Sequence, residues 1–422
     1  MPVRTPILIL ACLLSPAIVR AEACKLDTPP AATLLLPYFE VDLSRSDGVT
    51  TLFSIGNATS SATLAHVTLW TDLGVPTLNF NVYLTGWDIE TLNVRDILAG
   101  ILPRTASDGQ DPTDTVSPQG PYSQDVNFAS CQGILPHPAV IPQSFIAHLR
   151  AAHTGASSAL LSGSCSGRAL GDNRARGYVT VDVVKECTLL FPSDPGYFGP
   201  GGVASSANVL FGDYFIVDSP QNAARGDELV RLEAFPGRFH PGDATFYGRF
   251  KHGGSTTYQA VDDREPLPTA WATRYLQGGV FDGGSSFVVW RDPGVQTAVF
   301  PCNAPPQTTA FEDLQVFDEE EDVELPVTCP ILCPPSIHRV NFPAVAQRVG
   351  IGDLAIDDGF SASGIPITFP FGWTRMDFFH LNGLVDRAQA WVGAELEAAG
   401  RFSLGTVATP LEPACSAAPG GL

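Results

Sequence analysis

The sequence predicts a mostly β protein built from antiparallel β-sandwiches, and three observations lead to this fold class. Apolar residues recur at every second position over long stretches, which is the pattern of strands with one buried face. Turn residues separate these stretches at spacings that suit antiparallel strands. The best helical segment in the chain is short, Pro142–His153.

The strongest strand pattern lies in Val49–Leu84, where strands are expected at 49–55, 62–71 and 77–84, with turns between them. Successive side chains of a strand point to opposite faces, so each of these segments presents one apolar face. We expect the three strands to follow one another in one antiparallel sheet. Because each large apolar side chain removed from water contributes roughly 1.5–3 kcal/mol, a second layer must cover that sheet.

The remaining expected strands follow the same criteria. Residues 32–43 form the first, with Pro37 marking an edge or a bulge, because proline donates no hydrogen bond to a ladder. Later segments with a strand pattern are 92–94 followed by a helical turn, 178–184, 208–217, 229–234, and a C-terminal hairpin of 388–396 and 402–409.

Residues 1–23 have the features of an export signal. Arg4 is basic, Ile7–Val19 is apolar, and Ala21–Ala23 has the small-x-small pattern of a cleavage site. The apolar segment is shorter than the roughly 20 residues that span a bilayer, and no later run approaches that length. We therefore expect an exported protein without a transmembrane segment, in the periplasm, at the cell surface or outside the cell.

The chain has 422 residues and a formal net charge of −20. A negative field of this size repels phosphate backbones, so nucleic acid is not an expected partner. The length exceeds what one hydrophobic core usually holds. We expect two tandem sandwich domains, 24–262 and 266–422. In support of the second, Asp282–Trp290 follows the pattern of Asp47–Ile55, with a turn, small residues and an apolar run.

The first domain is expected to carry an insertion at residues 103–175. Proline, glycine, serine and aspartate dominate its first part, and such long connections are uncommon inside compact domains. The helix Pro142–His153 lies within it, with Pro142 at the start and Gly155 just beyond the end. We expect Cys131 and Cys165 to hold this insertion in place.

Cysteine content agrees with export. Eight cysteines follow the signal, and an even number in an oxidising compartment indicates disulfides. Eight cysteines allow 105 pairings, so the connectivity stays open. Only two of them lie close enough in sequence to suggest a metal site, and they lack further nearby ligands. The expected disulfide cysteines are Cys24, Cys131, Cys165, Cys187, Cys302, Cys329, Cys333 and Cys415.

One segment resembles a known kind of domain. The pattern of small polar residues followed by His-Val-Thr-Leu in Asn57–Leu69 resembles the B-to-C strand region of immunoglobulin-like modules on bacterial surface proteins. The resemblance covers a short stretch. It implies an immunoglobulin-like or related sandwich and carries no active site with it.

An enzymatic alternative rests on Gly163–Gly167, "GSCSG", which has the form of a hydrolase nucleophile elbow with Cys165 as nucleophile. An elbow needs a buried strand before it and a helix after it, whereas glycine-rich sequence flanks this motif. A disulfide is the favoured role of Cys165. His148 and His153 are five residues apart, so they do not share a helix face as a metal pair would.

The acidic run Asp318–Asp322 is a candidate for calcium, which binds carboxylate oxygens. The run lacks the alternating acidic spacing and the glycine that fold a calcium loop. A solvated loop is favoured, so no cofactor or metal is expected.

A basic and aromatic strip in 238–252 stands out in so acidic a chain. If 244–252 is a strand, Tyr247 and its neighbours at 249 and 251 share one face. The favoured interpretation is an edge strand whose cations discourage pairing between sheets. The functional hypothesis is a contact for an acidic partner, made by Arg238, His240, Tyr247, Arg249 and Lys251.

Together these observations predict an exported, non-catalytic surface, adhesion or envelope protein that binds a glycan or a protein partner. The alternative is a secreted hydrolase with its site in the 103–175 insertion. The oligomeric state stays open.

Overall fold

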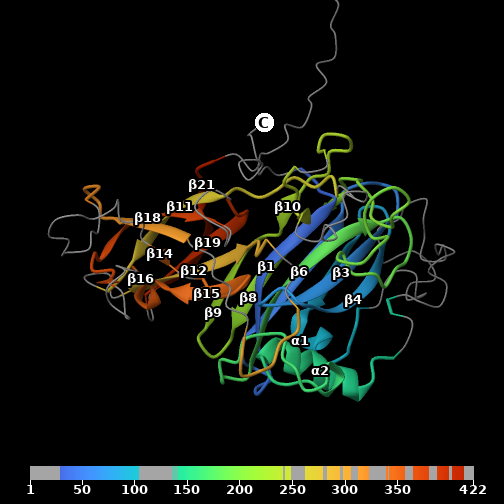
Figure 1. The fold of residues 1–422 in the computed structure, drawn as a ribbon, viewed down its shortest axis with the longest axis horizontal. Coiled ribbons are helices and arrows are strands. Elements are labelled where there is room, and N and C mark those ends of the chain that lie inside the picture. The colour runs from blue at the N-terminus through green and yellow to red at the C-terminus, as the bar shows by residue number, and fades with distance from the viewer. Residues whose placement is uncertain are drawn as a thin grey trace, which may run out of the picture.

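The computed structural model describes residues 29–103, 136–137, 140–240, 243–248, 262–278, 283–294, 298–305, 312–322, 339–340, 342–356, 365–379, 387–398 and 402–412. The described chain is mostly β, as predicted, with four antiparallel sheets and a small two-stranded ladder. Figure 1 shows the strands of the N-terminal half on one side of the molecule and those of the C-terminal half on the other.

The first sheet, here sheet B, is central to the N-terminal half. Its strand order is β10-β1-β6-β3-β4. Every residue of β1 and of β3 is buried, so both faces of this sheet are covered. The register of β1 against β6 shifts between Leu36 and Phe39, so Pro37 marks a bulge as expected. The strands are β1 (Thr33–Asp42), β3 (Thr63–Thr71), β4 (Pro76–Leu84), β6 (Arg174–Val184) and β10 (Val230–Leu232).

The second sheet, here sheet A, packs its inner face on β1. Its order is β5-β2-β8-β9, and β7 also pairs with β2. Phe53 and Ile55 of β2 point into the core, as the alternation predicted. The strands are β2 (Thr50–Asn57), β5 (Ile89–Asn93), β7 (Leu210–Phe211), β8 (Asp213–Asp218) and β9 (Ala223–Glu228).

The expectation of one sheet for the three strands of 49–84 is wrong. β3 and β4 pair with each other in sheet B, whereas β2 pairs with β5, β7 and β8 in sheet A. The chain crosses between the sheets after Asn57. The amide of that residue donates to the carbonyls of Ser61 and Thr85, which fixes the crossing loop. Period-two patterning determines which side chains are buried but does not say which strand lies alongside.

The predicted helix is confirmed as α2 (Gln143–Thr154), which begins after Pro142 and ends at Gly155 with a left-handed φ of 72°. It packs on β6 and β4. The expected helical turn after β5 is α1 (Val94–Ile97), and a 3₁₀ turn, η3 (Ala159–Leu161), follows α2. No helix in the described ranges is long and apolar enough to cross a bilayer.

The C-terminal half contains the other two sheets. Sheet F has the order β14-β13-β18-β11-β21, and sheet G the order β15-β12-β19-β20. The expected hairpin is confirmed as β19 and β20, which pair directly. The strands are β11 (Ala270–Leu276), β12 (Gly283–Arg291), β13 (Glu312–Phe317), β14 (Arg339–Val340), β15 (Ala346–Gly350), β16 (Ala355–Ile356), β17 (Ile365–Pro366), β18 (Phe371–Phe378), β19 (Ala390–Ala398), β20 (Phe402–Val407) and β21 (Thr409–Pro410).

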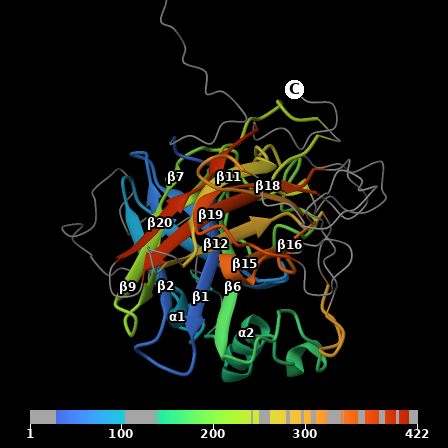
Figure 2. The same ribbon diagram turned by 90° about the vertical axis from the view of Figure 1, so that its left-hand side faces the viewer.

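The named strands pair only within their own half, but the hydrophobic core is shared. One cluster of buried residues includes side chains from all four sheets. Trp70 stacks on Tyr178 at a centroid distance of 5.6 Å, and Tyr178 meets Trp290 of β12 edge-on at 6.0 Å. β9 of sheet A lies beside β20 of sheet G (Figure 2).

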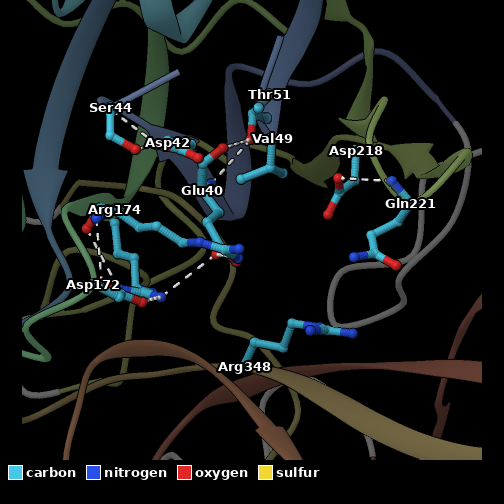
Figure 3. A network of polar contacts seen from close by, with 12 residues as sticks. Glu40, Asp42, Ser44, Val49, Thr51, Asp172, Arg174, Asp218, Gln221 and Arg348 are labelled. Atoms are coloured by element: carbon cyan, nitrogen blue, oxygen red, sulfur yellow. Dashed lines mark hydrogen bonds and ion pairs between the residues drawn. The ribbon is translucent and has the colours of Figure 1, made fainter. Parts of the chain in front are cut away.

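Charged side chains also join the halves. Arg225 of β9 is paired with Glu395 and Glu397 of β19 at 3.4 and 2.5 Å. Arg348 of β15 is 2.5 Å from Glu395, and the negative charges of Glu395 and Glu40 help to raise its pKa although burial opposes them. In Figure 3, Arg348 lies near the cluster in which Glu40 meets Arg174.

Candidate functional site

The outer face of sheet A carries large apolar side chains in contact with solvent. Leu52 of β2 is 37% exposed, Phe215 of β8 is 47% exposed, and Ile89 of β5 is 54% exposed. Isolated surface hydrophobics are common, but these lie on three adjacent strands of one sheet. We call the residues on this side of the sheet the outer face of sheet A.

The strand register arranges this face in rows. Leu52 faces Asn93 on one neighbouring strand and Phe215 on the other. Two residues along β2, Ser54 faces Thr91 and is hydrogen-bonded to Asp213. This second row is therefore polar.

The third row is apolar again. Gly56 lies between Ile89 and Phe211. A Cβ atom on Gly56 would come within 2.3 Å of the Phe211 ring, so the ring lies directly over the glycine. Phe215 is placed in the same way over Gly226, where a Cβ would come within 2.5 Å of its ring. Both glycines let a phenylalanine ring lie flat on the sheet.

These rows line a groove of about 790 Å³, which is within the usual range for ligand sites. Its rim carries Asp96 of α1 and the pair formed by Glu228 and Arg231, whose side chains are 3.0 Å apart. The lining residues are Leu52, Phe53, Ser54, Ile89, Thr91, Leu92, Asn93, Asp96, Phe211, Gly212, Asp213, Phe215, Glu228 and Arg231.

Ser54 and Asp213 form the polar centre of the groove. The Ser54 hydroxyl donates to Oδ1 of Asp213 at 2.5 Å, and the backbone N–H of Asp213 donates to the same hydroxyl oxygen at 3.2 Å. This pair fixes the carboxylate on the sheet surface. Since Asp213 is exposed, the carboxylate is available to a partner.

Trp87, just before β5, adds an exposed aromatic ring on a strained backbone. Its φ of 63° lies in the left-handed region, which bulky side chains rarely adopt. The N–H of Trp87 donates to the carbonyl of Thr59 at 2.8 Å, which holds this conformation.

The predicted basic strip is only partly at the surface. Arg238 and His240 are exposed, and the His240 ring is 3.6 Å from Asp243. Tyr247 is buried, and its hydroxyl donates to Asp182 at 2.9 Å. The expected strand at 244–252 is wrong over 244–248, where the chain forms no strand and turns at 246–248, and Arg249 and Lys251 lie outside the described residues. Tyr247 therefore belongs to the core, where its ring packs against those of Phe198 and Phe246.

The hydrolase alternative loses its nucleophile. Cys165 is bonded to Cys302, with Cα atoms 5.0 Å apart, so its thiol is not free. Cys165 holds the insertion as expected, and its partner, which the sequence left open, is in the C-terminal half. Cys187 is also in a disulfide. The other predicted disulfide cysteines, Cys24, Cys131, Cys329, Cys333 and Cys415, lie outside the described residues.

The two helix histidines have separate partners. His153 is buried between the Thr77 hydroxyl at 2.9 Å and the Arg176 carbonyl at 3.0 Å. Burial lowers its pKa from 6.5 to about 4. His148 is 2.7 Å from the Ser158 hydroxyl, but that hydroxyl also accepts from the Leu160 N–H and so caps η3. Within the described ranges, no three histidine, cysteine or acidic side chains gather as metal ligands.

The acidic run at 318–322 folds back on itself. Asp318 Oδ1 accepts hydrogen bonds from the N–H groups of Glu320 and Asp322, both at 2.9 Å. Oδ1 of Asp318 therefore closes a turn within the run.

A buried polar row crosses sheet B, and sequence reasoning did not anticipate it. Thr33, Asp182, His66 and Asn81 are direct neighbours on successive strands, and all four are fully buried. Asp182 accepts from Thr33 and from two tyrosine hydroxyls, those of residues 197 and 247. These groups satisfy one another inside the protein, so the row acts as internal structure.

No protein-family model, no curated protein and no solved structure matches this chain.

Proposed function

We propose that this chain is an exported, non-catalytic protein that binds a partner on the outer face of sheet A and acts at the cell surface or in the envelope. The observation that carries the proposal is the groove itself. Exposed Leu52, Ile89 and Phe215 line a space of about 790 Å³ around one fixed carboxylate. Covering such side chains stabilises a complex by roughly 25 cal/mol for each Å² of apolar surface removed from water.

Several features support binding rather than catalysis. The polar side chains in the groove are two hydroxyls, the Asn93 amide, exposed carboxylates and an arginine paired with Glu228. The base within reach of the Ser54 hydroxyl is the exposed Asp213 carboxylate, which is a weaker base than the histidine ring that usually activates a serine, and no histidine is among the lining residues. The signal-like segment at 1–23 supports export.

The proposal is tested by a binding screen of the mature protein against a glycan array and against bacterial envelope extracts. We compare the wild type with Phe215→Ser, which removes an exposed ring from the groove. Leu170→Ser is the matched control, because Leu170 is also about half exposed but lies in the loop after η3.

We expect the partner of the wild type to be lost or weakened with Phe215→Ser and kept with Leu170→Ser. Loss with both variants would indicate a nonspecific hydrophobic contact. Binding that persists with Phe215→Ser would place the binding site elsewhere and refute the proposal.

A further inference from the structure

Building on the proposed function, we infer that the groove on sheet A binds an extended, cationic polypeptide segment with apolar side chains on both sides of a lysine or arginine. The first argument is the charge of the groove. It contains the carboxylates of Asp96, Asp213 and Glu228 and a single cation, Arg231, which lies 3.0 Å from Glu228. Within the described part of the chain, no basic side chain pairs with Asp96 or Asp213. The groove therefore has a net negative charge and would attract a positively charged group.

The second argument is the repeat of the rows. Leu52, Ser54 and Gly56 are successive outward residues of β2, so the rows are about 7 Å apart, two residues along a strand. The rows read apolar, acidic and apolar. An extended segment lying along β2 would present its own alternate side chains at the same repeat. The matching pattern is apolar, any residue, lysine or arginine, any residue, apolar.

The other occupants fit less well. An anionic ligand would be repelled by the groove and by the net charge of −20. A second copy using the same face would bring Asp96 and Asp213 against carboxylates of the same sign. A neutral sugar would donate hydroxyl hydrogen bonds to the carboxylates, but it would bring neither a positive charge to the negative groove nor apolar side chains to the two apolar rows.

The test uses fluorescein-labelled synthetic peptides and the full mature protein. The first peptide has leucine, lysine and phenylalanine at alternate positions, separated by threonines. Two comparison peptides have glutamine or glutamate in place of the lysine. We expect the lysine peptide to bind at least about tenfold more tightly than the glutamine peptide, because a charge-assisted hydrogen bond is lost. The glutamate peptide should not bind, and added salt should weaken the lysine peptide alone.

The protein variants are Asp213→Asn and, because Asp213 has a hydrogen bond to Ser54, also the exposed Asp96→Asn. Glu319→Gln is the matched control, since it removes one negative charge from a remote turn. We expect either groove variant to reduce the preference for lysine by about tenfold and the control to leave it unchanged. Equal binding of the lysine and glutamine peptides, or an unchanged preference in both groove variants, would overturn the inference.

The same measurements separate this inference from the proposed function. If Phe215→Ser abolishes binding to an envelope partner while both carboxylate variants bind normally, the groove functions but its partner is not cationic. The same conclusion would follow if Phe215→Ser abolished binding to a glycan, or if it abolished self-association measured by sedimentation. If Phe215→Ser also binds normally, the proposed function fails as well.

Discussion

Burial of His153 should make the protein lose stability as the pH falls from neutral toward 4. The folded state holds this ring neutral and lowers its pKa from 6.5 to about 4. In the unfolded chain the ring takes up a proton near pH 6.5, so the unfolded state binds more protons below that pH. The stabilisation is complete above pH 6.5. At pH 4 about 3 kcal/mol of it is lost, because each pKa unit corresponds to about 1.4 kcal/mol.

One local contact works in the opposite direction but is smaller. The Thr77 hydroxyl lies 2.9 Å from Nε2 of His153 and 3.2 Å from the Leu69 carbonyl, so its single proton serves only one of them. A charged ring would donate to Thr77 and let both hydrogen bonds form together. That gain is about 1 kcal/mol, less than the cost of burying the charge.

The assay is urea unfolding of the wild type and His153→Gln at pH 7 and at pH 4. Differences between the two proteins cancel the other groups that titrate in this range. We expect the free energy of unfolding of the variant to fall by about 3 kcal/mol less than that of the wild type. His240→Gln, which alters an exposed ring, is the control and should behave as the wild type. The same pH dependence in His153→Gln and the wild type would refute the reasoning.

Three further predictions concern stability. Replacing Cys165 and Cys302 by serine should cost about 2–4 kcal/mol in urea unfolding, because the bridge closes a loop of 137 residues; no loss would mean that other contacts already hold that loop. Arg225→Met should cost about 2 kcal/mol by the same measurement, since it leaves the nearly buried Glu395 with one cation fewer, and an unchanged midpoint would mean that the contact is solvated. Gly177→Ala should cost about 3 kcal/mol or more, seen as a lower Tm, because its Cβ would lie 2.0 Å from a backbone oxygen of β3; a normal Tm would mean that the two strands can separate.

The strands and the longer helix could be predicted because local patterns determine them. Alternation in β2 and β3 and the proline and glycine at the ends of α2 depend on residues a few positions apart. The assignment of β2 to sheet A could not be predicted, since strand alternation is the same in either sheet. The pairing of Cys165 with Cys302 is equally invisible, because contacts across 137 residues leave no local pattern. The immunoglobulin-like resemblance stays a prediction.

The candidate site was missed for a related reason. Leu52 and Phe215 lie on the face of their strands opposite the core. In the sequence, the residues on that face are partly polar and partly apolar, so these two do not stand out. Only the register places them side by side and next to Asp213. A usable signal did exist, namely glycines within strands at Gly56 and Gly226, which often mark close approach of another group. The prediction that Tyr247 belongs to an exposed basic strip was wrong because the strand expected at that position does not form.

The shared core suggests that the two expected domains, 24–262 and 266–422, do not fold independently. Separated from the rest, the first would lose the Trp290 ring that packs on Tyr178 and on Phe246, and both would be exposed to water. Each such aromatic contributes roughly 1.5–3 kcal/mol through burial. Losing several of these contacts would consume much of the 5–15 kcal/mol by which domains are usually stable.

Expression of residues 24–262 alone tests this argument. We expect the fragment to be insoluble or to bind a hydrophobic dye, whereas the full mature chain unfolds in one cooperative transition. The fragment is compared with the same fragment carrying Tyr178→Ser and Phe246→Ser, because these substitutions remove the two rings that lose their contact with Trp290. Should the unaltered fragment be soluble, with a cooperative transition of its own, the aromatic contact between the halves would be an interface of separate domains instead of a common core.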